Sequence, residues 1–281
     1  MLRVEALFRY PVKSMLGEAL GTTAVGDRGF LGDRAYALVD QETGKVVSAK
    51  NPRRWGVLLQ CRAAFVEEPV VEAELPPVRI TLPDGDRVAS DDPTVHDRLS
   101  RLVDRAVRLE TEPAVGAVIE IVSPVVEGIA EVQEEVVTDS PVAMVAPGTF
   151  FDAAPLHLVT TATLTRLREI APGTVFSPGR FRPNVVVAVD TATDTGFVEN
   201  AWVNRALTLG DVEASVFLSA PRCVMTTLAQ ADLPRDPKVL QTIAHNNRFD
   251  IPGLGPSSCV GVYAIVTASG TTKLGDRVEV T

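Results

Sequence analysis

The sequence predicts a mainly β fold with a few helices (α+β), and three observations support this. Short runs rich in β-branched and aromatic residues recur along the chain, separated by Gly, Asp and Pro clusters, which is the pattern of strands and turns. Two runs carry apolar residues at helical spacing. No glycine-rich nucleotide-binding motif follows a strand, and the strand spacing is typical of a barrel or closed sheet rather than of alternating βαβ units.

The N-terminal part is predicted to form strands and hairpins, followed by one helix. The runs "RVEALFRYPV" and "GDRGFLGDRAYALVD" indicate strands, and "QETGK" indicates a turn before a return strand. The run "PPVRITLPDGDRV" predicts a hairpin with Asp84 and Gly85 at its turn. A helix is expected next, with Asp92 as N-cap, Pro93 in the first helical position, and apolar residues at helical spacing to about Leu109.

The C-terminal part begins with an acidic, valine-rich segment at 111–145, which we expect to be an irregular connector or an exposed segment. In "TTATLTRLREIAPG" a threonine caps a short helix that carries Leu164, Leu167 and Ile170 and ends near the Pro-Gly pair. The remainder is predicted to be mostly strand, in the runs "NVVVAV", "ALTLGDVEASVFL", "CVGVYAIV" and "DRVEVT".

Composition and charge exclude several classes of protein. The 281 residues carry a formal net charge of -9, with 27 basic and 36 acidic side chains, whereas nucleic-acid binders normally have a basic balance or a basic stripe. No apolar run is long enough to span a bilayer, and the N-terminus lacks the apolar core of a signal peptide. We therefore expect a cytoplasmic protein with no nucleic-acid partner and no membrane contact.

Four short stretches place basic side chains in loops or at strand edges. They are "YPVKS", "GDR", "GRFRPN" and "PRC", with the side chains Lys13, Ser14, Arg34, Arg180, Arg182, Asn184, Arg222 and Cys223. If these stretches converge, arginine forks and a lysine ammonium form an anion pocket in an otherwise acidic protein. Such a pocket also favours the thiolate of Cys223, and a thiolate suits a soft or high-valent metal rather than magnesium or calcium.

The cysteines leave two interpretations of Cys223 open. There are three cysteines at wide spacings, which excludes zinc-ribbon and iron–sulfur sites. Cys61 and Cys259 lie in apolar runs and are expected to be strand core. By itself Cys223 is either a functional thiolate beside Arg222 or a small apolar residue that fills a core.

A metal-free cysteine hydrolase is a third possibility, and it needs a general base near Cys223. His157 lies between two leucines and is expected to be a satisfied core histidine, whereas His96 is expected on the exposed side of its helix. His245 has polar neighbours in "AHNNR". Neither His157 nor His245 stands in a recognisable catalytic signature, which disfavours the hydrolase.

Taken together, these stretches resemble the MOSC domain family, named for the C-terminal domain of molybdenum cofactor sulfurases. The chain is most similar to the two-part subgroup that includes the mitochondrial amidoxime-reducing component and its bacterial relatives. "YPVKSMLGEAL", "GDRGFLGDRAYALVD" and "SAKNPRRW" resemble the N-terminal β-barrel domain of that subgroup. "LHLVTTATL", "RFRPNVVV", "WVNRALTLGDV", "PRCVMTTLAQ" and "GVYAIVTASGTTKLGDRVEV" resemble the MOSC β-barrel domain. The resemblance implies an N-terminal domain at 1–110 and a MOSC domain at 111–281, with 111–145 as an acidic connector.

The resemblance also implies a molybdenum cofactor (molybdopterin) held between the two domains. Cys223 matches the cysteine that ligates the metal. The positions that match those holding the anionic cofactor are Lys13, Ser14, Arg34, Arg182, Asn184 and Arg222. Thr160 and Thr161 fall where the family has small hydroxyl residues near the cofactor, in a looser alignment.

The implied activity is that of a molybdenum-dependent oxidoreductase that reduces small N-hydroxylated compounds or N-oxides. The chain lacks the four cysteines of an iron–sulfur cluster, so we expect electrons to come from a separate protein of ferredoxin or flavoprotein type. It lacks the pyridoxal-phosphate domain of the sulfurases and is not expected to be a desulfurase. The alternative is a sulfur-carrier or cofactor-delivery protein that uses a Cys223 persulfide.

Overall fold

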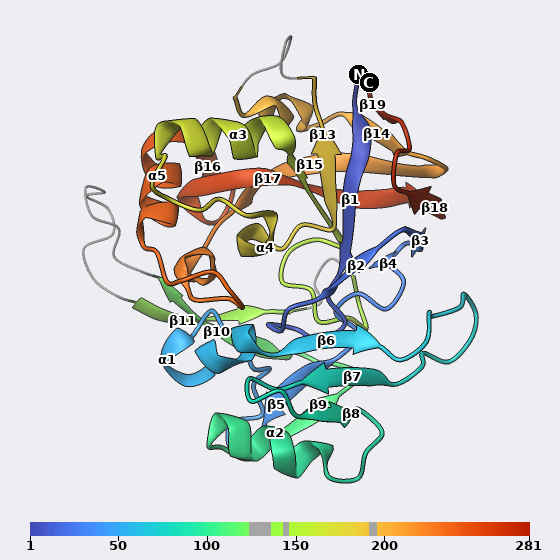
Figure 1. The fold of residues 1–281 in the computed structure, drawn as a ribbon, viewed down its shortest axis with the longest axis vertical. Coiled ribbons are helices and arrows are strands. Elements are labelled where there is room, and N and C mark those ends of the chain that lie inside the picture. Colours follow the sequence, from blue (N-terminus) through green and yellow to red (C-terminus); the bar gives the residue numbers. More distant parts are fainter. Residues whose placement is uncertain (124–135, 143–145, 191–195) are drawn as a thin grey trace.

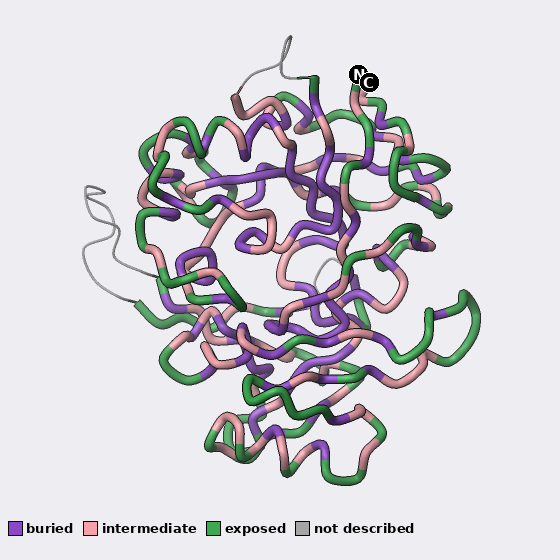
Figure 2. The backbone as a smooth tube through the Cα atoms, in the orientation of Figure 1, coloured by how far each residue is buried: buried purple, intermediate pink, exposed green. Residues whose placement is uncertain are grey.

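The computed structural model describes residues 1–123, 136–142, 146–190 and 196–281. It has the mainly β fold with a few helices that the sequence predicts, in two parts stacked along the long axis (Figure 1). Buried segments run through the middle of both parts (Figure 2). Within the described ranges, no helix is long and apolar enough to cross a membrane.

The upper part of Figure 1 is built on a nine-stranded sheet with the order β19-β14-β15-β17-β12-β13-β1-β2, and β16 also pairs with β17. Its strands are β1 (Arg3–Arg9), β2 (Glu18–Leu20), β12 (Leu156–Thr160), β13 (Val185–Ala188), β14 (Ala206–Leu209), β15 (Val212–Pro221), β16 (Arg248–Ile251), β17 (Gly255–Ala268) and β19 (Val278–Val280). Strand β1 opens the chain yet pairs antiparallel with β13, Leu7 opposite Val185. The N-terminal strand therefore belongs to the sheet of the C-terminal part.

Short sheets form most of the lower part and join it to the upper one. They are β5 (Ala37–Asp40) with β9 (Val107–Glu110), β6 (Arg62–Phe65) with β7 (Val78–Thr81) and β8 (Arg87–Ala89), β10 (Val118–Ser123) with β11 (Val136–Pro141), and β18 (Gly270–Lys273) with β3 (Thr22–Gly26) and β4 (Gly29–Phe30). The β7–β8 hairpin turns at Gly85 with φ +90, as the Asp84-Gly85 pair predicts.

The helices are short and lie outside the sheets. They are α1 (Pro52–Trp55), α2 (Val95–Val103), α3 (Thr161–Ile170), α4 (Pro178–Phe181) and α5 (Lys238–Asn246), with 3₁₀ turns η1 (Gly56–Gln60), η2 (Val198–Trp202) and η3 (Val224–Thr227). Two large apolar cores stand out among the buried clusters. One packs Trp55, Leu58 and Leu99 below, and the other packs Leu158 and Val262 in the large sheet.

The structure corrects the predicted bounds of α2. The N-cap is Thr94 rather than Asp92, because the Asp92 carboxylate accepts from the Thr94 amide and hydroxyl at 2.8 and 2.7 Å and keeps that turn outside the helix. The helix ends at Val103 because Asp104 takes a left-handed conformation, φ 50. The apolar residues up to Leu109 belong instead to β9, which pairs with β5.

Two further expectations need correction. The segment 111–145 is not irregular throughout: residues 111–117 form turns and bends, but β10 and β11 pair over six residues each, and β11 is mostly exposed. Residues 124–135 and 143–145 of that segment lie outside the described residues. The region predicted to be mostly strand also contains a helix that was not predicted: α5 packs Val239 and Ile243 into the core between α3 and β17.

Helix α3 is held at its start by a buried carboxyl group. The hydroxyl of its N-cap, Thr160, accepts from the Thr163 amide at 3.1 Å. Glu199, 1% exposed, accepts from the Thr160 and Thr163 hydroxyls at 2.7 and 2.6 Å through the same oxygen, Oε2. Burial raises the pKa of Glu199 above its usual value, although the two hydroxyl hydrogen bonds oppose this shift.

We expect Glu199→Gln to stabilise the protein at high pH and not at low pH. A carboxyl whose folded-state pKa is raised stabilises the fold fully below its unfolded pKa, and this contribution is lost as pH rises through the folded pKa. Each unit of elevation corresponds to about 1.4 kcal/mol. Thermal unfolding between pH 4 and pH 8 checks this, with Glu213→Gln, at an exposed position of β15, as control. Parallel melting curves for wild type and Glu199→Gln over the whole range would contradict it.

Candidate functional site

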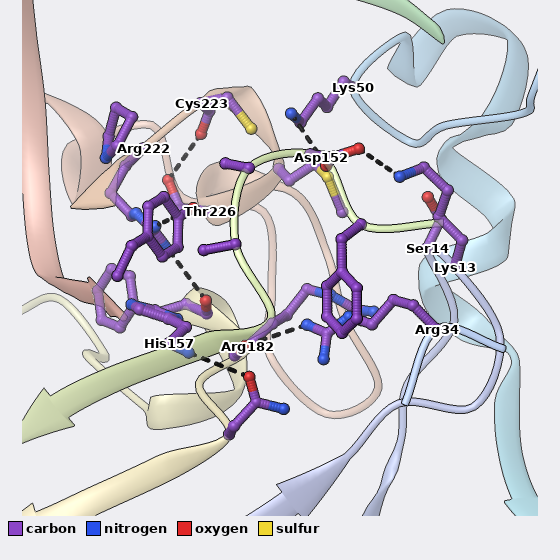
Figure 3. Close-up of a pocket in the computed structure, with 18 of the residues that line it drawn as sticks. Lys13, Ser14, Arg34, Lys50, Asp152, His157, Arg182, Arg222, Cys223 and Thr226 are labelled. Atoms are coloured by element: carbon purple, nitrogen blue, oxygen red, sulfur yellow. Dashed lines mark hydrogen bonds and ion pairs between the residues drawn. The ribbon is translucent and has the colours of Figure 1, made fainter. Parts of the chain in front are cut away.

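A cavity of about 140 Å³ lies where the two parts meet (Figure 3). The structure brings most of the predicted site residues to it: Lys13, Ser14, Arg34, Arg182, Asn184, Arg222 and Cys223. Its other charged walls are Lys50, Asp152 and Arg180. These side chains come from loops that are distant in the sequence, so the chain builds the cavity from both parts.

Three of the lining residues have left-handed backbones, which is uncommon for residues other than glycine. Ser14, Arg34 and Arg182 have φ values of 66, 50 and 54. Such conformations cost about 1–3 kcal/mol each, so the surroundings must impose them, and they cluster at functional sites. The Arg34 amide is held by the Tyr10 carbonyl at 2.9 Å, and the Arg182 amide by Pro178 at 3.1 Å, where it ends α4. Each turn directs its side chain at the cavity.

The Tyr10 ring contacts two guanidinium groups of like charge. The Arg34 and Arg182 guanidinium carbons each lie 4.4 Å from its ring centroid, within range of cation–π attraction. The Tyr10 hydroxyl donates to the Pro183 carbonyl at 3.2 Å, and burial raises its pKa to about 12, so the ring is a neutral spacer. Burial, with Arg34 nearby, lowers the pKa of Arg182 to about 10, which leaves it charged at neutral pH.

Arg222 is fixed on the opposite wall. Its Nη2 donates to the Tyr263 hydroxyl at 2.7 Å and its Nη1 to the Phe181 carbonyl at 3.0 Å. The His157 ring packs edge-on against Tyr263 and its Nε2 lies 3.2 Å from the Val260 carbonyl. Burial, and then the charge of Arg222, hold the pKa of His157 well below its usual value. His157 is therefore a neutral, hydrogen-bonded core residue that also forms cavity wall.

A carboxylate joins two lysines on the N-terminal side of the cavity. Lys13 Nζ donates to the Phe150 carbonyl at 2.7 Å and pairs with Asp152 Oδ1, and Lys50 Nζ lies 3.0 Å from Asp152 Oδ2. Burial lowers the pKa of Lys13 to about 8, against the attraction of Asp152. Burial alone would favour the neutral form of Asp152, but the two lysines hold its pKa below the usual range.

Cys223 presents a thiol at the start of η3. Its carbonyl accepts from the amide and hydroxyl of Thr226 at 3.2 and 3.0 Å, which fixes the turn. Cys223 is partly exposed, whereas Cys61 and Cys259 are buried, as expected of strand-core residues, and burial raises the pKa of their thiols to about 12 and about 11. Of these three thiols, the Cys223 thiol is the accessible one.

Arg180 stabilises the segment that follows Cys223. Its guanidinium donates to the carbonyls of Thr226, Leu228 and Pro234 at 3.2, 3.2 and 2.8 Å. These bonds cross-link α4 to the segment that follows Cys223. Arg180 thus donates its hydrogen bonds to backbone carbonyls and fixes the loop that follows Cys223.

Two predicted residues are not brought to the cavity, and a third has its amide group occupied. Thr160 and Thr161 do not line it, because Thr160 caps α3 and bonds Glu199, and the Thr161 hydroxyl accepts from the Val189 amide at 3.0 Å. Asn184 lines the wall, but its Nδ2 donates to Asp33 at 2.7 Å and its Oδ1 accepts from the His157 amide at 3.1 Å.

Sequence reasoning missed Lys50, Asp152 and Tyr263. Lys50 lies in the run "SAKNPRRW", which resembles the family, but by sequence a single lysine there cannot be distinguished from an exposed surface lysine. Asp152 stands in "GTFFDAA", where two aromatic residues before a carboxylate were the available signal. A larger groove, about 860 Å³, runs beside the glycine-rich loop at 26–32 and contains none of the predicted site residues.

A metal at Cys223 needs ligands from elsewhere. Among the residues that the structure describes, no three His, Cys, Asp or Glu side chains are grouped so that they could hold a metal ion. One thiol surrounded by cations suits an anionic cofactor that brings further ligands of its own. The donor set of the cavity therefore fits a metal-bearing anion better than a bare metal ion.

Comparison with known proteins covers both parts of the chain. The MOSC N-terminal beta barrel domain matches residues 1–91, and the MOSC domain matches residues 146–279. Mitochondrial amidoxime reducing component 2 of Rattus norvegicus is 35% identical over 131 residues, 45% of this chain and 37% of that protein. The same component of Bos taurus is 30% identical over 131 residues, with the same coverage. The match thus spans little more than a third of these relatives' length.

Among solved structures, the YUAD protein from Bacillus subtilis is similar over 100% of this chain and 96% of its own, with 11% sequence identity and a TM-score of 0.42. YiiM from Geobacillus stearothermophilus is similar over 46% of this chain and 54% of its own, with 16% identity and a TM-score of 0.32.

Because the two domain matches account for the parts that build the cavity, the chain belongs to the MOSC domain family, with a MOSC N-terminal beta barrel domain ahead of its MOSC domain.

Proposed function

We propose that this protein binds a molybdenum cofactor in the cavity between its two parts and is an oxidoreductase that reduces N-hydroxylated compounds or N-oxides. One observation carries the proposal: the accessible thiol of Cys223 faces a cavity that gathers cations from both parts of a protein whose net charge is -9. The similarity to amidoxime reducing components supports the type of reaction.

The residues fit each feature of such a cofactor. Molybdopterin is an anion with a phosphate, and guanidinium forks match phosphate geometry. Arg34 and Arg182, both in cation–π contact with Tyr10, and Arg222, bound to Tyr263, present such forks at fixed positions. Cys223 would bind the metal through its thiolate. When bound, the cofactor supplies two-electron redox chemistry, and the protein supplies binding, orientation and electrostatics.

The reaction balances with a partner protein. The N–O bond of the substrate breaks, two electrons and two protons are consumed, and the oxygen leaves as water. The electrons would come from a separate donor protein of ferredoxin or flavoprotein type, since the three cysteines of this chain do not make an iron–sulfur site. Cavity side chains with donor hydrogens, such as the ammonium of Lys13, can pass protons that solvent replaces.

The alternative is a sulfur carrier or cofactor-delivery protein in which Cys223 holds a persulfide. The accessibility of that thiol serves this function as well. A metal-free hydrolase is not supported, because His157 is bound to the Val260 carbonyl and His245, an exposed residue of α5, does not line the cavity. Metal content and turnover separate the two remaining functions.

We expect wild-type protein from a cofactor-producing host to contain close to one molybdenum per chain, and Cys223→Ser to lose most of it. The reason is that the serine hydroxyl is a far weaker ligand than a thiolate. Elemental analysis measures this, with Cys61→Ala, in the other core, as control. No metal in wild type, under conditions that load a known molybdoenzyme, would reject the proposal in favour of the persulfide carrier.

We also expect loaded wild type to reduce a generic amidoxime with a chemical reductant, and Cys223→Ser to lose at least about a hundredfold in kcat/KM, or about 2.7 kcal/mol of transition-state stabilisation. Product amidine is followed by chromatography. Full turnover by a Cys223→Ser protein that retains cofactor would remove Cys223 from the reaction.

Anion binding to the metal-free protein should weaken as pH rises through about 8. Lys13 is charged below its pKa of about 8 and neutral above it, so the cavity loses one positive charge across this range. Calorimetric titration with sulfate, whose own charge is constant, at pH 7 and pH 9.5 checks this. Lys13→Met should bind more weakly and lose the step. An unchanged wild-type affinity over that range would exclude Lys13 from anion binding.

A further inference from the structure

Lys50 lies in the cavity wall on the N-terminal side, facing the cysteine loop (Figure 3). Its side chain is 17% exposed and its Nζ lies 3.0 Å from Asp152 Oδ2. The other oxygen of the same carboxylate pairs with Lys13, which is 5% exposed. One carboxylate is thus shared by two ammonium groups that come from separate stretches of the chain.

The backbone around Lys50 is tied to the loop that carries Lys13. The Ser14 hydroxyl accepts from the Ala49 amide at 3.0 Å, so the residue after Lys13 holds the residue before Lys50. The Lys50 carbonyl accepts from the Val122 amide at 2.9 Å, which anchors the segment to β10. These bonds place both lysines on one wall, and Ser14 has its hydroxyl engaged in this task.

Counting charges shows what Lys50 adds. Lys13, Lys50 and Asp152 together carry one net positive charge, whereas Lys13 and Asp152 without Lys50 carry none. Charges in a partly desolvated cavity interact strongly, so one unit of net charge changes the binding of an anion considerably. Lys50 therefore leaves this wall attractive to an anion although a carboxylate stands in it.

Lys50 also lies in the field of Cys223. Burial disfavours its charged form, but Asp152 and then Cys223 outweigh burial and raise the pKa of Lys50 to about 12. Lys50 is accordingly charged throughout the working range of pH. Lys50 belongs to the N-terminal part and Cys223 to the C-terminal part, and both line the same cavity.

We propose that Lys50 is a positioning residue of this cavity: it holds Asp152 jointly with Lys13 and leaves one net positive charge beside Cys223 for the anionic group bound there. The inference rests on the proposed function for the identity of that group. It concerns the two ammonium groups that share the Asp152 carboxylate, whereas the hydrogen bonds of Arg182 and Arg222 go to the Met15 and Phe181 carbonyls and to the Tyr263 hydroxyl.

Binding of inorganic sulfate to the metal-free protein at pH 6.5 and low salt tests this, by calorimetry. We expect Lys50→Met to weaken sulfate binding about tenfold, equivalent to about 1.4 kcal/mol. Lys50→Arg should retain most of the affinity, because it keeps the charge. The double variant Lys50→Met with Asp152→Asn should recover the wild-type affinity, because its wall again carries one net positive charge.

Lys45→Met is the matched control, because Lys45 pairs with Glu120 and Asp139 away from the cavity, and it should bind sulfate as wild type does. Wild-type affinity in Lys50→Met would overturn the proposal. So would a double variant as weak as Lys50→Met, since a merely structural loss is not restored by removing a second contact.

The molybdenum content of Lys50→Met and Lys50→Arg gives an independent reading on loaded protein. Less metal in the first variant and near-normal metal in the second is expected. The two proposals fail separately: metal-free wild type from a loading host rejects the molybdenum function, whereas sulfate binding that ignores Lys50 rejects this inference alone.

Discussion

The buried carboxylate of Asp33 is the interaction on which the site depends. It accepts from the Tyr10 amide at 2.7 Å, from Asn184 Nδ2 at 2.7 Å and from the Arg34 guanidinium. Tyr10 follows β1 and Asn184 precedes β13, so one carboxylate fixes the ends of two paired strands and the cation between them. A buried carboxylate is stable only when such donors surround it, and here two of the donors, Arg34 and Asn184, line the cavity.

Around Asp33, each of the like-charged side chains of the cavity has a partner that stabilises it. Arg34 and Arg182 both contact one tyrosine ring, Arg222 is bound to a tyrosine hydroxyl, and Lys13 shares Asp152 with Lys50. Each cation is thus fixed by a neutral aromatic, a carbonyl or a carboxylate before any ligand arrives. Fixed donors reduce the ordering cost of binding, which is the benefit of preorganisation.

The sequence predicted those parts of the site that lie in recognisable local motifs. Arg34, Arg182, Arg222 and Cys223 stand at turns before or after strands, where chain direction alone brings side chains to a sheet edge, and they do meet. Lys50 and Asp152 were not foreseen, because their partnership joins residues about a hundred positions apart and leaves no local pattern. Helix α5 was missed for a related reason: its capping position is a proline in αR conformation without a side-chain cap. Thr160 shows the converse, since the hydroxyl that a family pattern suggests for a ligand is used as a helix cap.

Environment, rather than residue type, separates the three cysteines. Cys61 and Cys259 are fully buried, and desolvation raises the pKa of both thiols, so that they stay protonated at neutral pH. Cys223 stands where β15 has just ended, on a turn fixed from below by Arg180 and faced from the other part by Lys50. That cation comes from the N-terminal part and the thiol from the C-terminal part, so both parts contribute to the surroundings of Cys223. Substitutions in either part can therefore alter the charges that line the cavity, without altering the nine-stranded sheet that leads to Cys223.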